Sequence, residues 1–382
     1  MNFNRLKDFL DYYLPMLGVP GSDTIIYKDH EEIFRHQSGF DNLKYRTPMR
    51  ADAVHNMFSC TKIATCVAAL QLIERGEILI NDPIHVYFPE YKNLQVARKG
   101  LDGKVRLEKA KNPILIRHLF SMTSGLDYNI RRSSIEFVKK NTDGRCPTLD
   151  IIRALPMDPL VCEPGERYVY GLSHDVLGGL VELISGMKLG DYMKKNIFDP
   201  LGMKDTTFDI GHNNFERMAS QYEYDSVGRC AIDVLKDSNI MRFGSEYQSG
   251  GAGLLSTVDD FILLTDALAN GGVGKNGARI LSAASVELMR SPSLSAEQQQ
   301  FFEIGAQNMG YDFGLGVRVM RDPAKAGSLV PAGAFGWDGK KMCFSVSDPK
   351  NHLAIFHAEE IDGMNSILIP RLLNVIYSCF DD

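Results

Sequence analysis

The sequence has 382 residues, of which 44% are hydrophobic and 24% are charged, a composition typical of a globular protein. This length suffices for one large domain or for two closely packed ones. The formal net charge of −6 gives no indication of nucleic acid or an anionic membrane surface as a partner, and no run approaches the roughly 18 apolar residues of a membrane helix.

The N-terminal stretch MNFNRLKDFLDYYLP predicts an amphipathic helix, with Phe3, Leu6, Leu10 and Tyr13 on its apolar side. Asp8 and Asp11 interrupt the apolar residues, so the stretch does not resemble a secretory signal peptide. Residues 24–29 and 33–40, separated by a polar turn, are then predicted to form a strand pair.

The stretch 55–76, HNMFSCTKIATCVAALQLIERG, combines a reactive motif with a helical pattern. Ile63, Val67 and Leu70 recur at helical spacing, Ala64, Ala68 and Ala69 make the other side apolar, and Gly76 supplies a stop. A helix from about Ser59 to Gly76, buried on nearly all sides, is therefore predicted.

Ser59 and Lys62 form the motif S-x-x-K at the start of this helix, where residues three apart share a face. The helix N-terminus favours a serine alkoxide and, with desolvation, disfavours a protonated lysine. The expected chemistry is attack by Ser59 with a neutral Lys62 as the base. The same residues also fit a serine N-cap followed by a lysine that extends to water, so the motif alone does not decide.

From 81 to 300 the pattern is mainly helical with long loops, and the segments 174–186 and 257–272 are the clearest helices. Residues 92–112 carry many basic side chains but are interrupted by Gly100 and Gly103, which favours a solvated loop over a binding patch.

Beyond residue 300 the pattern returns to strands at 315–322, 341–348 and 352–359. A last helix has Leu368, Leu372, Val375 and Ile376 on its apolar side. Strands at both ends predict an α/β (α+β) fold, in which residues 1–56 and 301–382 build an antiparallel sheet flanked by helices. Residues 57–300 would form a large, mainly helical insertion, with the active site at the interface of the two parts.

Several landmarks, in this order along the chain, resemble the serine β-lactamase and penicillin-binding-protein superfamily. They are FSCTKIAT (58–65), LIERGEILINDPIHVYFPEY (72–91), IRHLFSMTSGL (116–126), PGERYVYGLSHDVLGGLVELISG (164–186), IFDPLGMKDTTF (197–208), SGGAGLLSTVDDF (249–261), YDFGLGV (311–317) and FGWDGKKMCFSVSDP (335–349). The sequence is most similar to the branch that contains class C β-lactamases and family VIII carboxylesterases.

The resemblance implies Ser59 as nucleophile, Lys62 as base and Tyr170 as the tyrosine of the family's Y-x-N element. Tyr170 would pass the proton to the leaving alcohol and then activate the deacylating water. The implied oxyanion hole consists of the backbone N–H groups of Ser59 and Lys340, each donor being worth roughly 3–4 kcal/mol. Tyr168 is a near neighbour of Tyr170 that competes for the same assignment.

Two departures from the family pattern affect the substrate. The K-T-G element is replaced by Trp337-Asp338-Gly339, and the asparagine of Y-x-N is replaced by Leu172. A tryptophan cannot hold a substrate carboxylate, and Asp338 would repel one if it faced the site. Lys340 and Lys341 are nearby cations whose direction the sequence leaves open. These changes favour an uncharged ester over a penicillin, and Tyr128 and Tyr247 are further candidates for lining the pocket.

Other catalytic motifs are absent or badly spaced. Ser173-His174-Asp175 are adjacent and cannot form triad geometry, so Ser173 is expected to cap the following helix. The sequence contains neither G-x-S-x-G nor H-E-x-x-H, which disfavours an α/β-hydrolase and a zinc protease.

The resulting prediction is a serine hydrolase of carboxylesterase type, acting on small or medium esters without a metal or organic cofactor. A β-lactamase, a D-amino-acid amidase or peptidase and a transpeptidase remain enzymatic alternatives, and a catalytically silent binding module is the non-enzymatic one. Seven cysteines without metal-type spacing favour a reduced, cytoplasmic location. The expected partner is a small-molecule ester, with no nucleic acid or membrane, and the oligomeric state does not follow from the sequence.

Overall fold

The computed structural model describes residues 1–100, 102–211, 216–227, 230–233, 239–304 and 308–380. Its largest sheet has eight strands, all paired antiparallel. In spatial order they are β10 (Tyr311–Phe313), β11 (Arg318–Met320), β12 (Phe335–Asp338), β13 (Phe344–Asp348), β14 (Leu353–Ala358), β1 (Gly21–Lys28), β2 (Glu31–Asn42) and β3 (Thr47–Pro48). The first and last parts of the chain therefore build one sheet, which confirms the predicted fold class.

Alternation along the central strands separates the two faces of this sheet. Ile26 and Ile355 face a core shared with the terminal helices, whereas Ile25 and Phe356 face the core shared with the helical region. Successive side chains of a strand point to opposite faces, so apolar residues at consecutive positions indicate a strand covered on both sides.

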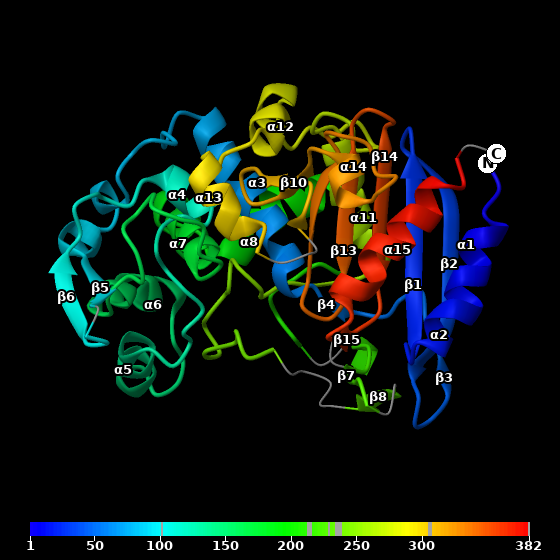
Figure 1. Cartoon of the computed structure of the whole chain (residues 1–382), viewed down its shortest axis with the longest axis horizontal. Coiled ribbons are helices and arrows are strands. Elements are labelled where there is room, and N and C mark those ends of the chain that lie inside the picture. Colours follow the sequence, from blue (N-terminus) through cyan, green and yellow to red (C-terminus); the bar gives the residue numbers. More distant parts are fainter. Residues whose placement is uncertain (101, 212–215, 228–229, 234–238, 305–307, 381–382) are drawn as a thin grey trace.

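The terminal helices cover one face of the sheet, and the chain ends lie close together (Figure 1). They are α1 (Asn4–Asp8), the π-helical turn η1 (Phe9–Tyr13) and α2 (Leu14–Met16), together with α15 (Asn365–Tyr377). Leu6, Leu10 and Leu14 are buried against α15 and the sheet, which confirms the predicted first helix and the Leu6 and Leu10 part of its apolar side, whereas Phe3 and Tyr13 are only partly buried.

The chain between the two sets of strands is mainly helical. It contains α3 (Thr61–Glu74), α4 (Ile116–Phe120), α5 (Ser133–Asn141), α6 (Thr148–Ala154), α7 (Ser173–Ser185), α8 (Leu189–Met193), α9 (Asp199–Leu201), α11 (Val258–Ala269), α12 (Ala283–Arg290) and α13 (Ala296–Phe302), while α14 (Pro323–Ala326) follows β11. The α3 helix is buried at every residue from Thr61 to Leu72, as its pattern predicts.

Short strands complete the structure. The turn that holds Ser59 is preceded by β4 (His55–Asn56), which pairs with β9 (Leu255–Ser256). A small sheet joins β15 (Ile361–Asp362), β7 (Tyr222–Asp225) and β8 (Cys230–Asp233). Within the described residues, no helix has both the length and the apolar character needed to cross a membrane.

The structure differs from the sequence expectations in several places. Within 92–112, predicted as a solvated loop, β5 (Gln95–Lys99) and β6 (Val105–Lys109) form an antiparallel hairpin, in which every β6 residue is exposed. The strand predicted at 315–322 begins only at Arg318, because Gly314 N donates to Val317 O across a turn. The residues of α11 fall within the range predicted as the helical insertion. The helix nevertheless packs on the sheet, where its Phe261 contacts Phe356 of β14.

Candidate active site

Ser59, the predicted nucleophile, lies where a short strand turns into the buried α3 helix. Met57 N donates to Leu254 O, and Phe58 adopts a positive φ of 41°, which turns the chain sharply before the 3-10 turn η2 (Phe58–Cys60). A positive φ is unusual outside glycine and is maintained only by the surrounding structure. This turn presents the partly exposed Ser59 to a cavity at the start of α3.

Lys62 is fully buried one turn further along and donates to three oxygens. Its Nζ lies 3.0 Å from Ser59 Oγ, 2.8 Å from the Tyr128 hydroxyl and 2.7 Å from the Gly251 carbonyl. An ammonium group has three N–H donors and no acceptor, so this set of partners matches its capacity. The predicted shared face of Ser59 and Lys62 is confirmed, and Lys62 does not extend to water.

The electrostatic surroundings of Lys62 differ from the expectation. Burial lowers the pKa of Lys62, but the oxygens of Tyr128 and Tyr170 and the Asp175 carboxyl outweigh burial and leave it above the ordinary lysine value. The helix N-terminus and desolvation led to the expectation of a lowered Lys62 pKa, whereas in the folded site these oxygens raise it. The helix N-terminus and desolvation act locally, whereas the two tyrosines and the aspartate lie in distant parts of the sequence.

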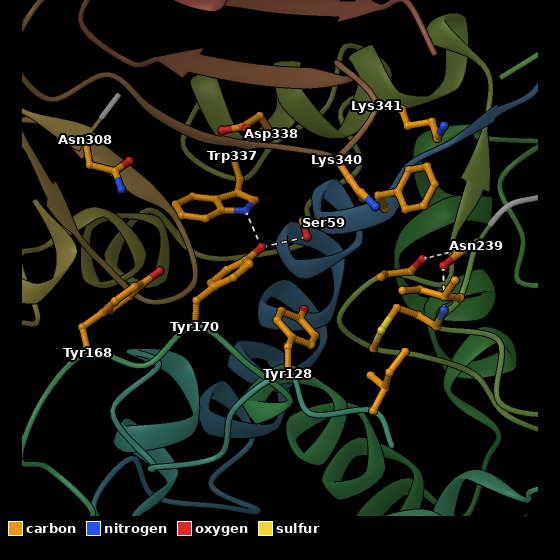
Figure 2. A pocket seen from close by; sticks show the side chains of 15 residues that line it. Ser59, Tyr128, Tyr168, Tyr170, Asn239, Asn308, Trp337, Asp338, Lys340 and Lys341 are labelled. Atoms are coloured by element: carbon orange, nitrogen blue, oxygen red, sulfur yellow. Dashed lines mark hydrogen bonds between the residues drawn. The ribbon is translucent and has the colours of Figure 1, made fainter. Parts of the chain in front are cut away.

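Tyr170 reaches the nucleophile from the loop before α7. Its hydroxyl donates to Ser59 Oγ at 2.7 Å, and Trp337 Nε1 donates to the same hydroxyl at 3.1 Å (Figure 2). Lys62 Nζ lies 4.8 Å from the centroid of the Tyr170 ring. The neighbouring Tyr168 instead packs against Phe302 and Phe313. The structure thus brings Ser59, Lys62 and Tyr170 together.

A cavity of about 540 Å³ opens above Ser59. It is lined by Phe58, Ser59, Tyr128, Ile130, Tyr168, Tyr170, Asn239, Ile240, Met241, Ala252, Asn308, Trp337, Asp338, Lys340 and Lys341. This volume falls in the range of small-molecule sites, and aromatic and apolar side chains make up much of the wall.

Three residues predicted to contact substrate lie outside this lining. Leu172 is fully buried just before α7, Tyr247 is buried with its hydroxyl donating to Asp175 at 2.8 Å, and Gly339 packs against Met57 O. Chain position alone placed Leu172 and Tyr247 near the pocket, but packing directs both side chains into the core. Ser173 likewise does not cap α7, because its hydroxyl is bonded to that of Ser124.

The charged groups of the cavity wall are paired within the protein. Asp338 accepts from Arg318 at 2.8 Å and from Asn365 at 2.9 Å, so its charge is compensated. Lys340 pairs with Asp362 at 3.1 Å, and the buried Lys341 donates to Tyr222 O at 3.0 Å. Arg318, which sequence analysis missed, also lies over the Trp337 ring, 5.5 Å from its centroid.

The predicted oxyanion hole is compatible with the positions of its two residues. Ser59 and Lys340 both border the cavity, and among the described residues neither backbone N–H has a hydrogen-bond acceptor. Two free amides beside a nucleophile are what a developing oxyanion requires. No group of three or more metal-ligating side chains occurs in the described part of the chain.

Asn239, Asn308 and Tyr168 also line the cavity, but no motif singles them out in the sequence. Asn308 Oδ1 accepts from Arg318 at 3.4 Å, and Asn239 Nδ2 donates to Ala252 O at 2.7 Å. These contacts join segments that lie far apart or in loops. Residues of this kind carry no periodic signal by which sequence alone finds them.

A sheet built from both chain ends, a helical region between them and a Ser–Lys–Tyr cluster where they meet define a β-lactamase-like fold. The Beta-lactamase family profile matches residues 6–358. The chain therefore belongs to the β-lactamase family, whose members include serine hydrolases and acyltransferases.

Known proteins resemble the chain over most of its length. Esterase EstB of Burkholderia gladioli is 28% identical over 360 residues, spanning 88% of this chain and 84% of the esterase. Acyltransferase calJ of Penicillium decumbens is 28% identical over 367 residues, spanning 90% of this chain and 84% of that protein. The solved structure of EstCE1, a hydrolase with promiscuous acyltransferase activity, has a TM-score of 0.78 at 23% identity, covering 98% of this chain and 97% of that chain, and it shows the same fold.

Proposed function

We propose that this protein is a serine carboxylesterase that cleaves small or medium, uncharged carboxylic esters through an acyl-enzyme on Ser59. The observation that carries this proposal is Ser59 Oγ held between Lys62 Nζ and the Tyr170 hydroxyl at 3.0 and 2.7 Å beside a cavity. A hydroxyl nucleophile within hydrogen-bond reach of two proton-transfer groups is the arrangement that covalent acyl transfer needs.

In the proposed reaction, loss of one proton from the Lys62–Tyr170 pair creates the base. Ser59 attacks the ester carbonyl and passes its proton to this pair, and the oxyanion forms near the Ser59 and Lys340 amides. Tyr170 then returns the proton to the departing alkoxide, which leaves as the alcohol. Water repeats the sequence in deacylation, giving its proton to the pair, which returns it to Ser59 Oγ as the carboxylic acid leaves.

The position of Tyr170 orients the substrate, because the group that protonates the leaving oxygen must lie beside it. The leaving alcohol therefore occupies the side of the cavity where Figure 2 places Tyr170, Tyr168 and Trp337, with Asn308 at its end. The acyl chain takes the side near Asn239, which is bonded to Ala252 and Met241. We infer a flat or aromatic alcohol and a short aliphatic acyl group.

The cavity favours esters over β-lactams because it offers no unpaired cation among its described lining residues. Trp337 replaces the lysine that grips a carboxylate in β-lactamases, and Lys340 and Lys341 already have partners. A penicillin carboxylate would enter without a counter-charge and would lose part of its hydration.

Intact-protein mass after treatment with a fluorophosphonate probe, comparing wild type with Ser59→Ala, tests the nucleophile. Turnover of p-nitrophenyl acetate, p-nitrophenyl butyrate and nitrocefin is measured on the same samples. The proposal expects a single adduct that disappears in Ser59→Ala, together with turnover of the p-nitrophenyl esters. Dominant nitrocefin turnover would support a β-lactamase instead, and neither label nor turnover would leave a binding module.

Acyl transfer to an alcohol is a second candidate function, favoured by the similarity to calJ and by the aromatic wall beside Tyr170. The same acyl-enzyme would react with a bound alcohol in place of water, with Tyr170 removing the alcohol's proton. Adding an aromatic alcohol to the p-nitrophenyl butyrate assay and measuring butyrate ester against butyric acid distinguishes the two reactions.

We also propose a cytoplasmic location, with no nucleic-acid or membrane partner. The location is supported by five buried cysteines that form no disulfide with one another: Cys60, Cys66, Cys146, Cys162 and Cys343. Unpaired cysteines are usual in a reducing compartment.

A further inference from the structure

Asp175 lies in the first turn of α7 and is buried behind the catalytic cluster, with 1% of its surface exposed. Its Oδ1 accepts from the Tyr247 hydroxyl at 2.8 Å and from Ser249 Oγ at 2.6 Å. Among the described residues, no lysine or arginine forms a direct ion pair with it. An ionised carboxylate at such depth requires compensation from nearby charge or hydrogen bonds.

The short backbone segment 249–251 lies between Asp175 and Lys62. Lys62 donates to the Gly251 carbonyl at 2.7 Å, and a Cβ added at Gly251 would lie 2.5 Å from Asp175 Oδ2 and 3.4 Å from the Tyr128 hydroxyl. The carboxylate therefore packs directly against the peptide that holds the Lys62 ammonium. Glycine at this position permits the close approach.

We propose that Asp175 is a positioning residue of the acyl-transfer site, which fixes the 249–251 segment beneath Lys62 and supplies the negative charge that keeps Lys62 an ammonium in the resting enzyme. The proposal deepens the proposed function and rests on it for the role of the Lys62–Tyr170 pair. Asp175 touches neither substrate nor Ser59 and acts through Gly251 and Lys62.

Tyr128 and Tyr170 contribute more than Asp175 to the raised pKa of Lys62, but neither is a carboxyl. Burial raises the pKa of the Cys60 and Cys66 thiols and of the Tyr128 hydroxyl, and burial together with the Lys62 charge lowers the pKa of His174 to about 3. These groups are therefore neutral at pH 7. Tyr170 and, behind Asp175, Tyr247 also lie around Lys62. Among the described groups in these surroundings, Asp175 is the one that carries a carboxyl group.

The hydrogen bonds of Asp175 favour its ionised form. Burial raises the pKa of Asp175, whereas Ser249, the Lys62 charge and Tyr247 oppose this rise. Its Oδ2 has no hydrogen-bond partner among the described residues, so a proton placed there would bury a donor without an acceptor. Two hydroxyl donors on Oδ1 stabilise the carboxylate form.

The first test is the pH profile of kcat/KM in Asp175→Asn with p-nitrophenyl butyrate. A nearby negative charge raises the proton affinity of the Lys62–Tyr170 pair, so its removal should move the acidic limb to lower pH by about one unit or more. Asp260→Asn makes the same exchange at a buried aspartate of α11 that accepts from Asp205 N and Thr206, and it should leave the limb in place. An Asp175→Asn profile that loses rate without moving its limb would overturn the proposal.

The second test needs no substrate, and its wild-type arm needs no Asp175 variant. In protein labelled with 15N-lysine, the Lys62 Nζ resonance is identified by its absence in Lys62→Arg. In the wild type it should keep the ammonium shift to above pH 9, and in Asp175→Asn it should titrate at lower pH. A wild-type Lys62 that is neutral at pH 7 would refute the proposal even if Asp175→Asn does not fold. A protein that turns over no esters would contradict the proposed function, but the Lys62 resonance would still test the role of Asp175.

Discussion

Trp337 Nε1 donates a hydrogen bond of 3.1 Å to the hydroxyl of Tyr170, and that hydroxyl in turn lies 2.7 Å from the nucleophilic oxygen of Ser59. The sequence resemblance implies that this tryptophan takes the place of the lysine of the K-T-G element. An indole N–H is a neutral donor without an acceptor function, so it orients the tyrosine oxygen and adds no charge that a substrate carboxylate could use. In the proposed reaction, Trp337 would thus bear on both proton transfer and substrate choice.

Trp337→Phe should lower kcat for p-nitrophenyl butyrate by about tenfold, equal to about 1.4 kcal/mol, because one hydrogen bond to Tyr170 is lost. The phenyl ring retains the edge contact with Phe313, whose centroid lies 5.3 Å from that of Trp337. Stopped-flow or steady-state kinetics gives kcat, and circular dichroism shows whether the fold is retained. An unchanged kcat would show that the indole N–H contributes nothing to proton transfer.

Tyr128→Phe should lower kcat about tenfold or more, because it removes one of the three acceptors of the buried Lys62. An unsatisfied buried donor costs about 1–3 kcal/mol, more when it is charged, so the melting temperature should fall as well. Tyr87→Phe is the matched control: it removes a hydroxyl that donates to Asp82 outside the cavity, and its kinetics should equal those of wild type. Wild-type rates in Tyr128→Phe would exclude this role for its hydroxyl.

Gly171→Ala should reduce activity at least tenfold by displacing the neighbouring Tyr170. A Cβ at residue 171 would lie 2.1 Å from Leu126 O, and relief of such a clash by backbone movement costs about 1–3 kcal/mol. Gly76→Ala provides the comparison: its φ of 69° is strained for alanine, but nothing lies within 4 Å of the added Cβ. That variant should lose about 1 kcal/mol of stability and keep its activity. Equal activities in the two variants would contradict the assigned position of Tyr170.

His118 should make the protein sensitive to acid. Burial, followed by the charge of Arg117, lowers the pKa of His118 to about 4, and its Nδ1 accepts from Leu115 N at 3.2 Å. The folded-state pKa of His118 lies below the unfolded value of about 6.5. The contribution of neutral His118 to the free energy of unfolding is therefore complete above pH 6.5 and is lost as the pH falls toward 4. The loss amounts to about 3 kcal/mol if the unfolded histidine titrates normally.

His118→Gln tests this pH dependence, because glutamine at this helix position also accepts from the N-cap N–H without titrating. Urea unfolding at pH 7.5 and pH 4.5 should show a smaller difference in the variant than in the wild type. The same difference in both proteins would assign the acid sensitivity to other groups.

Local sequence determined a large part of this protein. The i, i+3 spacing of Ser59 and Lys62 places both on one face of a turn, and apolar residues on every side of 61–72 require a buried helix. The strands at 24–29 and 352–359 follow from short apolar runs bounded by turn residues, and the terminal helices follow from helical spacing. The order of the family landmarks supplied Tyr170 and Trp337, which no periodicity identifies.

Only the tertiary structure decided the direction and charge of the remaining side chains. Leu172 and Tyr247 were expected in the pocket but point into the core, whereas Arg318 arrives from another strand to neutralise Asp338. The acceptors that hold Lys62 include Tyr128 and Gly251, 66 and 189 residues away along the chain. Periodicity reports which face of an element is buried, whereas a pKa depends on all charges and oxygens within a few ångströms, and folding brings those together from unrelated parts of the sequence.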